Sequence, residues 1–189
     1  MNKKILKNTI IFLRNILNKI FINNNLYLRE LTINDKDDIF NYSSDVEFCK
    51  YLDFNVPKNS DDILPFLRQI TNDNNSGTRI YWGIEYKNKI IGTIGLLNIN
   101  NIKMKAELGF GIGKKYWGKG IINRCIENVL NYSFIQKKFK IIKIGTNINN
   151  IRANNFILKT GFIKDKETKI HTYYNMTKDR YLSKINMDK

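Results

Sequence analysis

The residues best suited to chemistry lie in one stretch of the chain, from Glu107 to Ile121. The sequence Glu-Leu-Gly-Phe-Gly-Ile-Gly-Lys-Lys-Tyr-Trp-Gly-Lys-Gly-Ile predicts a strand that runs through a glycine- and lysine-containing turn into a helix. Such a turn presents several backbone N–H groups together with the positive end of the helix dipole, which suits a pyrophosphate. Gly118 and Gly120 allow close approach of the backbone, and the lysines of this stretch add positive charge.

Two common phosphate-binding motifs are excluded for this turn. Its glycines lack the G-x-G-x-x-G spacing of a Rossmann fold, and repeated parallel strand–helix units do not follow it. No Gly-Lys-Ser/Thr occurs, which excludes a Walker loop. Because loops use glycine for turns in all proteins, the turn alone does not identify a ligand.

The elements that must position this turn follow from hydrophobic periodicity and turn residues. The expected strands are Leu26–Leu31, Ile80–Tyr86, Ile90–Ile99, 105–112, Ile141–Asn147, Phe162–Lys166 and His171–Met176, and the expected helices are 36–52, 60–72, 118–134 and 150–160. The order is therefore one strand, two helices, three strands, a helix, a strand, a helix and two closing strands. This order predicts a single α/β (α+β) domain around a mixed central sheet.

The N-terminal segment, residues 1–25, is expected to be a basic amphipathic helix followed by a linker at Asn23–Asn25. Apolar residues recur at helical spacing between residues 5 and 21, and the segment carries no acidic residue. Three interpretations stay open: a helix packed on the domain, a helix that contacts a membrane or a partner, and an organellar presequence. The domain itself is assigned to residues 26–189.

The net charge of +15, from 32 basic and 17 acidic residues, first suggests a nucleic-acid partner. Lysine, asparagine and isoleucine dominate the composition, however, and all three have A/T-rich codons, so a biased genome also explains the excess. The distribution says more: residues 26–85 carry 11 of the 17 acidic residues and six basic ones. The chain thus has an acidic front and a basic back.

Cysteine and histidine are scarce. Cys49 and Cys125 fall at apolar positions of expected helices, which indicates buried free thiols and a reducing compartment, the cytoplasm. His171 is the only histidine and has no cysteine cluster beside it, so no metal site is expected.

The turn resembles a motif of a known family. Lys115-Tyr-Trp-Gly118-Lys-Gly120 is similar to the acyl-CoA pyrophosphate turn of the GNAT N-acetyltransferases, with lysine in the first position, and the chain looks like the RimJ/RimL-type (Acetyltransf_3-type) branch. Further stretches that resemble this branch, in the same order, are Leu26–Thr32, Tyr42–Leu52, Tyr81–Leu96 and Asn150–Phe162. The resemblance covers about residues 26–165.

The resemblance implies a GNAT-like fold whose sheet splays at its fourth strand, residues 105–112. It also implies direct attack of an amine on acetyl-CoA, the cosubstrate, with Glu107 as general base through water and without a metal. The CoA-binding residues implied are Phe110, Gly111 and Ile112 along the pantetheine, Lys115, Tyr116, Trp117, Gly118, Lys119, Gly120 and Ile121 around the pyrophosphate, and Asn150 beside the pantetheine arm. Two simpler interpretations stay open: Glu107 as a strand-end carboxylate paired with a lysine, and Asn150 as a helix N-cap.

Two residues depart from the family pattern. Ile157 stands where many members carry a tyrosine acid, and Ala153 stands where the branch often has serine. The general acid is therefore open among Tyr132, Tyr173, Tyr174 and solvent.

The leading hypothesis is a cytoplasmic N-acetyltransferase, a monomer or a homodimer, that acts on a protein N-terminal α-amine or a small-molecule amine. The acidic front would then draw a cationic amine and the basic back the anionic cosubstrate, with no nucleic-acid partner. The alternative from another class is a non-catalytic module on the same fold that binds CoA or nucleic acid.

Overall fold

The computed structural model describes residues 19–52 and 54–187 of the chain. Its strands are β1 (Ile20–Asn23), β2 (Leu26–Arg29), β3 (Ile80–Tyr86), β4 (Lys89–Asn100), β5 (Lys105–Ile112), β6 (Ile141–Asn147), β7 (Ile163–Glu167) and β8 (His171–Thr177). Its helices are α2 (Lys36–Ser43), α3 (Val46–Cys49), α4 (Leu64–Ser76), α5 (Ile121–Asn131), α6 (Ile151–Lys159) and α7 (Lys178–Met187). None of the described helices is long and apolar enough to cross a membrane.

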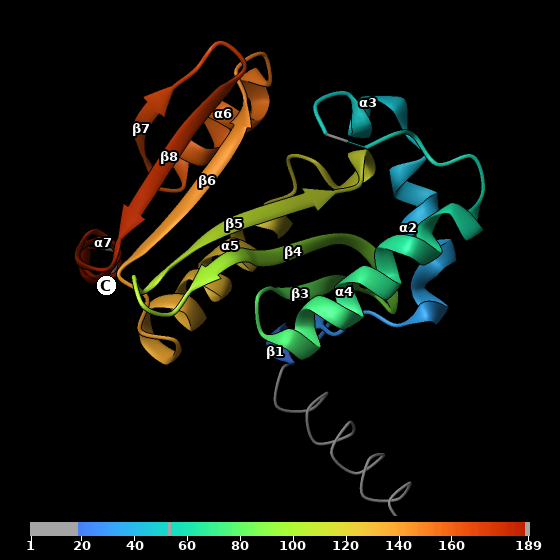
Figure 1. Ribbon diagram of the computed structural model, residues 1–189, viewed down its shortest axis with the longest axis horizontal. Helices are drawn as coiled ribbons and strands as arrows, with labels where there is room; N and C mark the ends of the chain where they lie inside the picture. The colour runs from blue at the N-terminus through green and yellow to red at the C-terminus, as the bar shows by residue number, and fades with distance from the viewer. Residues whose placement is uncertain (1–18, 53, 188–189) are drawn as a thin grey trace, which may run out of the picture.

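The described strands form one mixed sheet in the order β1-β2-β3-β4-β5-β6-β8-β7. All neighbours are antiparallel except β5 and β6, which run parallel and pair over Lys105–Glu107 against Ile141–Lys143. Beyond these pairs the two strands diverge and leave an opening between them (Figure 1). This arrangement confirms the prediction of a mixed sheet that splays at strand 105–112.

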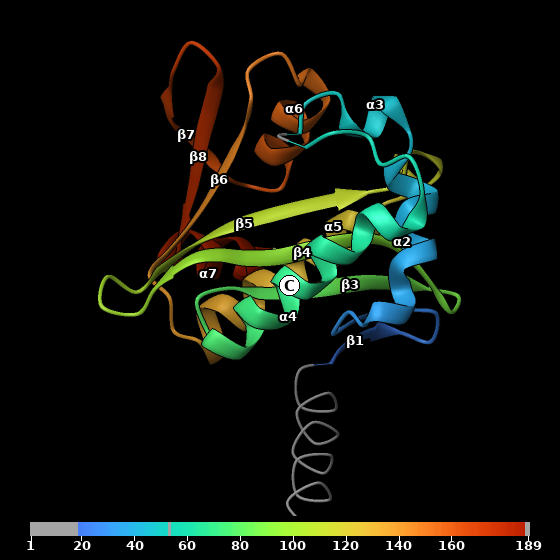
Figure 2. The ribbon, with the colours of Figure 1, turned by 45° about the vertical axis from the view of Figure 1, so that its right-hand side comes forward.

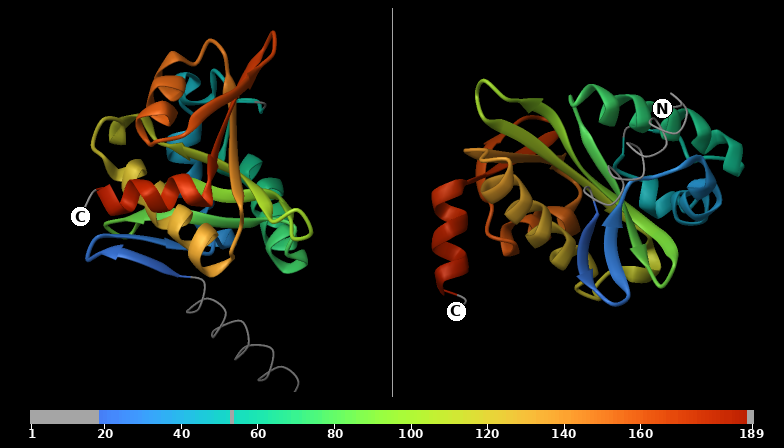
Figure 3. Two further views of the ribbon diagram at one scale, coloured as in Figure 1. Left: turned by 90° about the vertical axis from the view of Figure 1, so that its left-hand side faces the viewer. Right: turned by 90° about the horizontal axis from the view of Figure 1, so that it is seen from below.

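Helices cover both faces of the sheet (Figure 3). We call the face under α2 and α4 the front face, where Leu31, Ile39 and Leu67 form a small core. The back face carries α5, α6 and α7 over a larger core that includes Trp82, Ile94 and Phe134. Because side chains alternate along a strand, this layering decides which β5 residues face which side.

The first strand is the main departure from the expected elements. Ile20–Asn23 pairs antiparallel with β2, and Asn24 and Asn25 form the hairpin turn, so this part of the expected helix and linker is wrong. Ile20 and Ile22 pack against the back-face core, which favours an extended chain there. The remainder of the expected helix, residues 5–18, lies outside the described residues. The C-terminal helix α7 was not anticipated.

Two expected helices have different bounds. The helix expected over 36–52 is divided into α2 and α3, because the Asp45 side chain accepts a hydrogen bond from Glu47 N at 2.8 Å and starts a new helix. The helix expected over 118–134 begins at Ile121 as α5 and ends in a π-helical turn at Tyr132–Gln136. The other expected helices and strands agree with the structure to within a few residues at each end.

Candidate functional site in the opening between β5 and β6

The edge of β5 that faces the opening carries main-chain groups that β6 does not pair. Gly113 N donates to Ile91 O at 2.8 Å, which directs the odd-numbered residues of this strand toward β4. By alternation, Phe110 and Ile112, beyond the last β5–β6 pair, direct their N–H and C=O groups toward the opening. An extended ligand could therefore pair with this edge as an added strand would.

The turn after β5 ends where α5 begins. Gly118 and Gly120 have φ of +72° and +70°, in the left-handed region that favours glycine. A Cβ at either position would meet no other atom of the described chain within 4 Å, so both face open space. Gly120 is the N-cap of α5, and no described side chain caps this helix start. The first N–H groups of α5 and the ammonium of Lys119 thus remain suited to an anion.

Trp117 and Tyr116, both expected to contact the pyrophosphate, have packing roles in the structure. The Trp117 indole donates to Ile112 O at 2.7 Å and so ties the turn back to β5. Tyr116 packs edge-on against Tyr86, with the ammonium of Lys115 5.1 Å from its ring centroid. A cavity of about 570 Å³ lies beside these rings, with Lys119 and Arg124 in its wall.

Glu107 lies at the last point where β5 and β6 are paired. Its neighbours Ala106 and Leu108 are buried in the back-face core, so its own exposed side chain lies on the front face. A register shift in β4 places Asn98 nearby, and Asn98 Nδ2 donates to Glu107 Oε2 at 2.9 Å. Lys143, opposite Glu107 on β6, pairs with Asp165 at 3.1 Å instead. Within residues 19–52 and 54–187, Glu107 is thus bound by a neutral amide and does not form the lysine ion pair that the simpler interpretation expected.

Phe110 and Asn150 lie close to the opening. The Phe110 ring packs edge-on against Phe156 of α6, with 5.8 Å between centroids, so it fixes α6 relative to β5. Asn150 Oδ1 accepts from Ala153 N at 3.1 Å, and Asn150 is therefore the N-cap of α6. The capping interpretation of Asn150 is confirmed.

Three residues that the sequence did not single out complete the front of the site. Phe48 of α3 lies on Gly111, where an added Cβ would approach the ring to 3.0 Å. Glu47 of α3 forms ion pairs with Lys114 of the turn and, at 3.7 Å, with Arg152 of α6. Arg152 also lies over the Trp117 ring, 3.8 Å from its centroid. The two helices lie side by side across the wide end of the opening (Figure 2).

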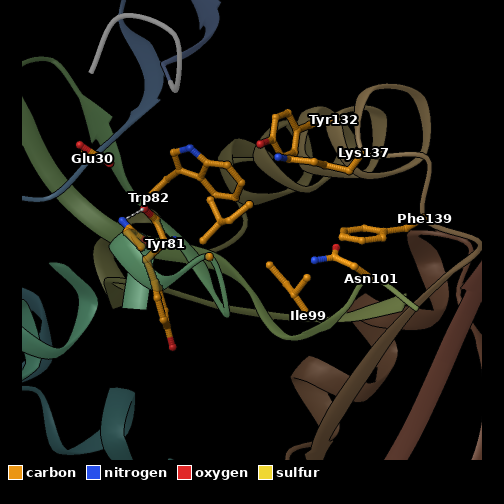
Figure 4. A pocket seen from close by; sticks show the side chains of 11 residues that line it. Glu30, Tyr81, Trp82, Ile99, Asn101, Tyr132, Lys137 and Phe139 are labelled. Atoms are coloured by element: carbon orange, nitrogen blue, oxygen red, sulfur yellow. Dashed lines mark hydrogen bonds between the residues drawn. The ribbon is translucent and has the colours of Figure 1, made fainter. Parts of the chain in front are cut away.

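The tyrosines named as candidate acids lie in three different places. Tyr132 packs edge-on against Trp82 of β3, in a cavity of about 320 Å³ away from the opening (Figure 4). Tyr174 faces the back, where its hydroxyl donates to Asn154 Oδ1 at 2.6 Å and burial raises its pKa. Tyr173 faces the front, over Gly145 of β6. Ile157 is buried in the back-face core and supplies no proton.

The acidic front is less available to a ligand than the sequence suggests. Within residues 26–85, the acidic side chains with a described ion pair are Asp35, Asp38, Glu47, Asp61, Asp73 and Glu85. Much of this charge therefore holds neighbouring elements together. Among the described residues no group of three or more histidine, cysteine or acidic side chains is arranged to hold a metal ion.

The comparisons with known proteins agree with this geometry. Residues 25–163 match the family model described as an acetyltransferase (GNAT) domain. The chain is 27% identical to the uncharacterized N-acetyltransferase YoaA of Bacillus subtilis, over 80% of this chain and 87% of that protein.

Two solved structures share the fold. The ribosomal L7/L12 α-N-protein acetyltransferase RimL is 14% identical, with a TM-score of 0.77 over 84% of this chain and 93% of that one. Spermidine N-acetyltransferase from Vibrio cholerae, in complex with CoA and spermine, is 23% identical, with a TM-score of 0.71 over 85% of this chain and 99% of that one. The family match spans most of the residues that build the sheet and all that form the turn and the opening. The chain therefore belongs to the GNAT acetyltransferase family and is an acyltransferase.

Proposed function

We propose that this acyltransferase moves the acetyl group of acetyl-CoA directly to an amine, with Glu107 as general base. One observation carries the proposal: the unpaired edge of β5 runs from the uncapped start of α5 down to Glu107. A single extended molecule with a pyrophosphate at one end would thus bring its other end to this carboxylate.

The residues of the opening fit CoA by their chemistry. The N–H groups at Gly118–Ile121 and the Lys119 ammonium suit the pyrophosphate, and the empty space beside both glycines leaves room for it. The amides of a pantetheine arm could pair with the N–H and C=O of Phe110 and with the N–H of Ile112, as a neighbouring strand would, while Ile112 O already accepts from Trp117. Trp117 and Asn150 support this site by fixing the turn and the start of α6.

Glu107 suits the role of base because of its position and its partner. An attacking amine must lose a proton, and a carboxylate takes it directly or through one water molecule. Asn98 orients the Glu107 carboxylate with a neutral hydrogen bond. Burial raises the pKa of Cys49 and, to about 12, that of Cys125, so neither thiol suits an acyl-enzyme route.

The acceptor is proposed to be a protein N-terminal α-amine or a small-molecule amine. The structural neighbours include an enzyme named for a ribosomal protein and one named for spermidine, which supports both classes. On the front face, the rings of Tyr42, Phe48 and Phe54 form an aromatic wall beside Gly111, with centroid separations of 5.2 and 6.5 Å. Aromatic faces of this kind attract an ammonium or pack on its alkyl chain. We place the enzyme in the cytoplasm, a reducing compartment that suits its two free, buried thiols.

The decisive experiment follows CoA release from acetyl-CoA with spermidine and with a short peptide that has a free N-terminus. We expect Glu107→Gln to lower kcat about 100-fold while the Kd of acetyl-CoA by calorimetry stays within about twofold of wild type. Glu127→Gln on α5, where Asn123 donates to the carboxylate, is the control and keeps full activity. An unchanged rate for Glu107→Gln at saturating acceptor across the pH range would remove Glu107 as base.

A further inference from the structure

Acetyl transfer leaves a thiolate that needs a proton, and the source of that proton can be sought in the structure. This inference rests on the function proposed above. Ile157, at the position where the family often has a tyrosine, has no proton to give and is buried. A donor must therefore come from another element that borders the opening.

Strand register places Tyr173 on the same face of the sheet as Glu107. Glu107 pairs with Lys143 of β6, Lys143 pairs with Asn175 of β8, and Gly145 pairs with Tyr173. Because alternate residues share a face, Tyr173 lies on the front face, two residues beyond the last β5–β6 pair. Glu107 therefore borders the opening on the β5 side, and Tyr173 borders it on the β6 side.

Gly145 shows which way the Tyr173 ring leans. A Cβ at Gly145 would lie 3.1 Å from Cε1 and 3.2 Å from Cδ1 of Tyr173, so the ring rests on the glycine backbone. Neighbouring strands are about 4.8 Å apart, and a ring that starts on β8 and covers β6 directs its hydroxyl toward the opening. Glycine at this position is explained by the ring, since its φ is not in the left-handed region.

Charged groups on this face surround the Tyr173 phenol. The Lys166 ammonium of β7 lies 4.8 Å from the ring centroid, and the His171 ring of β8 is 6.1 Å away. The Lys143–Asp165 pair joins β6 to β7, and Glu107 lies across the opening on β5. The Tyr173 ring thus lies among side chains of β6, β7 and β8, on the same face of the sheet as Glu107.

We propose that Tyr173 is the proton donor to the leaving thiolate. The amine nitrogen forms a bond to the acetyl carbon, the bond from that carbon to sulfur breaks, and the sulfur takes the Tyr173 hydroxyl proton. Water then returns a proton to the phenolate, while Glu107 holds the proton from the amine until solvent removes it. Tyr132 is unsuitable because it lines a separate cavity beside Trp82 of β3. Tyr174 is unsuitable because its hydroxyl donates to Asn154 on the back face.

The test compares Tyr173→Phe with Tyr174→Phe, an adjacent tyrosine that loses its hydroxyl on the opposite face. We expect Tyr173→Phe to lower kcat about 100-fold with spermidine or peptide as acceptor, with the acetyl-CoA Kd and the melting temperature near wild type. Gly145→Ala, which pushes the ring away, lowers kcat in the same direction, and Tyr174→Phe keeps kcat within about twofold.

Wild-type activity in the same assay separates the two proposals. If wild-type protein releases CoA and Tyr173→Phe keeps kcat within about threefold, this inference is overturned and the proposed function stands. A loss in Tyr173→Phe that appears wholly as weaker acetyl-CoA binding also overturns it. If wild-type protein binds acetyl-CoA but acetylates none of the amines, both proposals fail.

Discussion

Asp35 holds the first helical turn of the domain to the sheet. It is 6% exposed, and its two carboxylate oxygens accept from Arg29 at 2.7 and 2.9 Å and from Thr32 N at 2.6 Å. Arg29 also pairs with Glu85 of β3, which in turn accepts from Tyr27. Four side chains thus connect β2, β3 and the start of α2 behind the front-face core.

The pKa of Asp35 reports the strength of this connection. Burial opposes ionisation of the carboxyl, but the Arg29 and Thr32 hydrogen bonds outweigh it and lower the pKa below its ordinary value. A carboxyl with a lowered pKa in the folded state stabilises the fold above about pH 4, its unfolded value, and loses that contribution as pH falls through the folded pKa.

We therefore expect Asp35→Asn to lower the free energy of unfolding at pH 7 by about 3 kcal/mol, because it leaves Arg29 partly buried with one carboxylate fewer. The difference from wild type narrows as the pH falls below about 4 and through the lowered folded pKa of Asp35, because the wild-type carboxyl then takes up its proton. Urea unfolding at several pH values measures this. Asp37→Asn, an exposed acid on the same helix, is the control and changes stability by less than about 0.5 kcal/mol. A stability deficit for Asp35→Asn that stays constant over the whole acid range in which wild-type stability declines would contradict the assignment.

Some residues of the site could be identified from the sequence, and others could not. Gly118, Gly120 and Glu107 could be named because a glycine-rich turn and a strand-end carboxylate are local patterns, and the structure brings them to one opening. Glu47 and Gly145 could not, because their importance depends on α3 meeting α6 and on β8 lying beside β6. Contacts between segments so far apart in the chain leave no local signal.

The turn between β5 and α5 offers a matched comparison of two glycines. Gly120 and Gly77 have φ of +70° and +71°, and a Cβ on either would meet nothing within 4 Å. Gly120 is the N-cap of α5 and Gly77 is the C-cap of α4. An alanine should therefore cost each position about the same backbone strain, roughly 1 kcal/mol. They differ in location, since Gly77 follows α4 on the front of the sheet.

We expect Gly120→Ala to weaken acetyl-CoA binding at least tenfold, because its methyl group would occupy the space that suits a phosphate. Gly77→Ala should leave the Kd of acetyl-CoA unchanged. Both variants should lower the melting temperature by similar amounts. Calorimetry and thermal unfolding on both variants give the four numbers needed. Equal loss of affinity in the two variants would show that strain, not ligand contact, explains the effect at Gly120.

Glu47 links α3 to the turn and to α6 through charges that an anionic ligand would also attract. Replacement by glutamine frees Lys114 and Arg152 for that ligand, so we expect Glu47→Gln to tighten acetyl-CoA binding about two- to threefold at low salt. The effect should disappear at 0.5 M NaCl, where exposed charges are screened. Weaker binding at low salt would instead mean that Glu47 holds the two cations in their binding positions.

The order and type of the helices and strands were more predictable than the residues at which each begins and ends. Strands over 80–86 and 141–147 were expected with the bounds observed, because β-branched and aromatic residues lie between clear turn residues. Ile20 was assigned to a helix because it continues the helical spacing of the apolar residues before it, and Asn23 was assigned to a linker. Pairing with β2 selects the extended chain for both. A short segment fits the helical period of 3.6 and the strand period of 2 equally well, and here tertiary contacts with the sheet select the strand.

The hairpin of β1 and β2 determines where the domain begins. β1 is the edge strand of the described sheet, its Ile20 and Ile22 pack on the back-face core, and the Lys19 ammonium lies 3.7 Å from the Tyr27 ring centroid. The β1–β2 turn is also bound to the β3–β4 turn, because Asn25 O accepts a hydrogen bond from Lys87 N at 2.9 Å. We therefore propose that the folding unit includes residues 19–25 and does not begin at residue 26, as the hydrophobic pattern suggested.

Two deletions test this boundary. Removal of residues 1–18 leaves every described strand pair in place, and we expect a melting temperature within about 2 °C of wild type. Removal of residues 1–25 also removes the partly buried Ile20 and Ile22 side chains, which lowers the free energy of unfolding by about 2 kcal/mol. For a domain of this size, that loss lowers the melting temperature by about 6 °C. The second deletion also leaves Leu26–Arg29 as a bare edge, so increased aggregation should accompany the loss. Equal melting temperatures for the two deletions would place the boundary at residue 26 and make β1 dispensable to the fold.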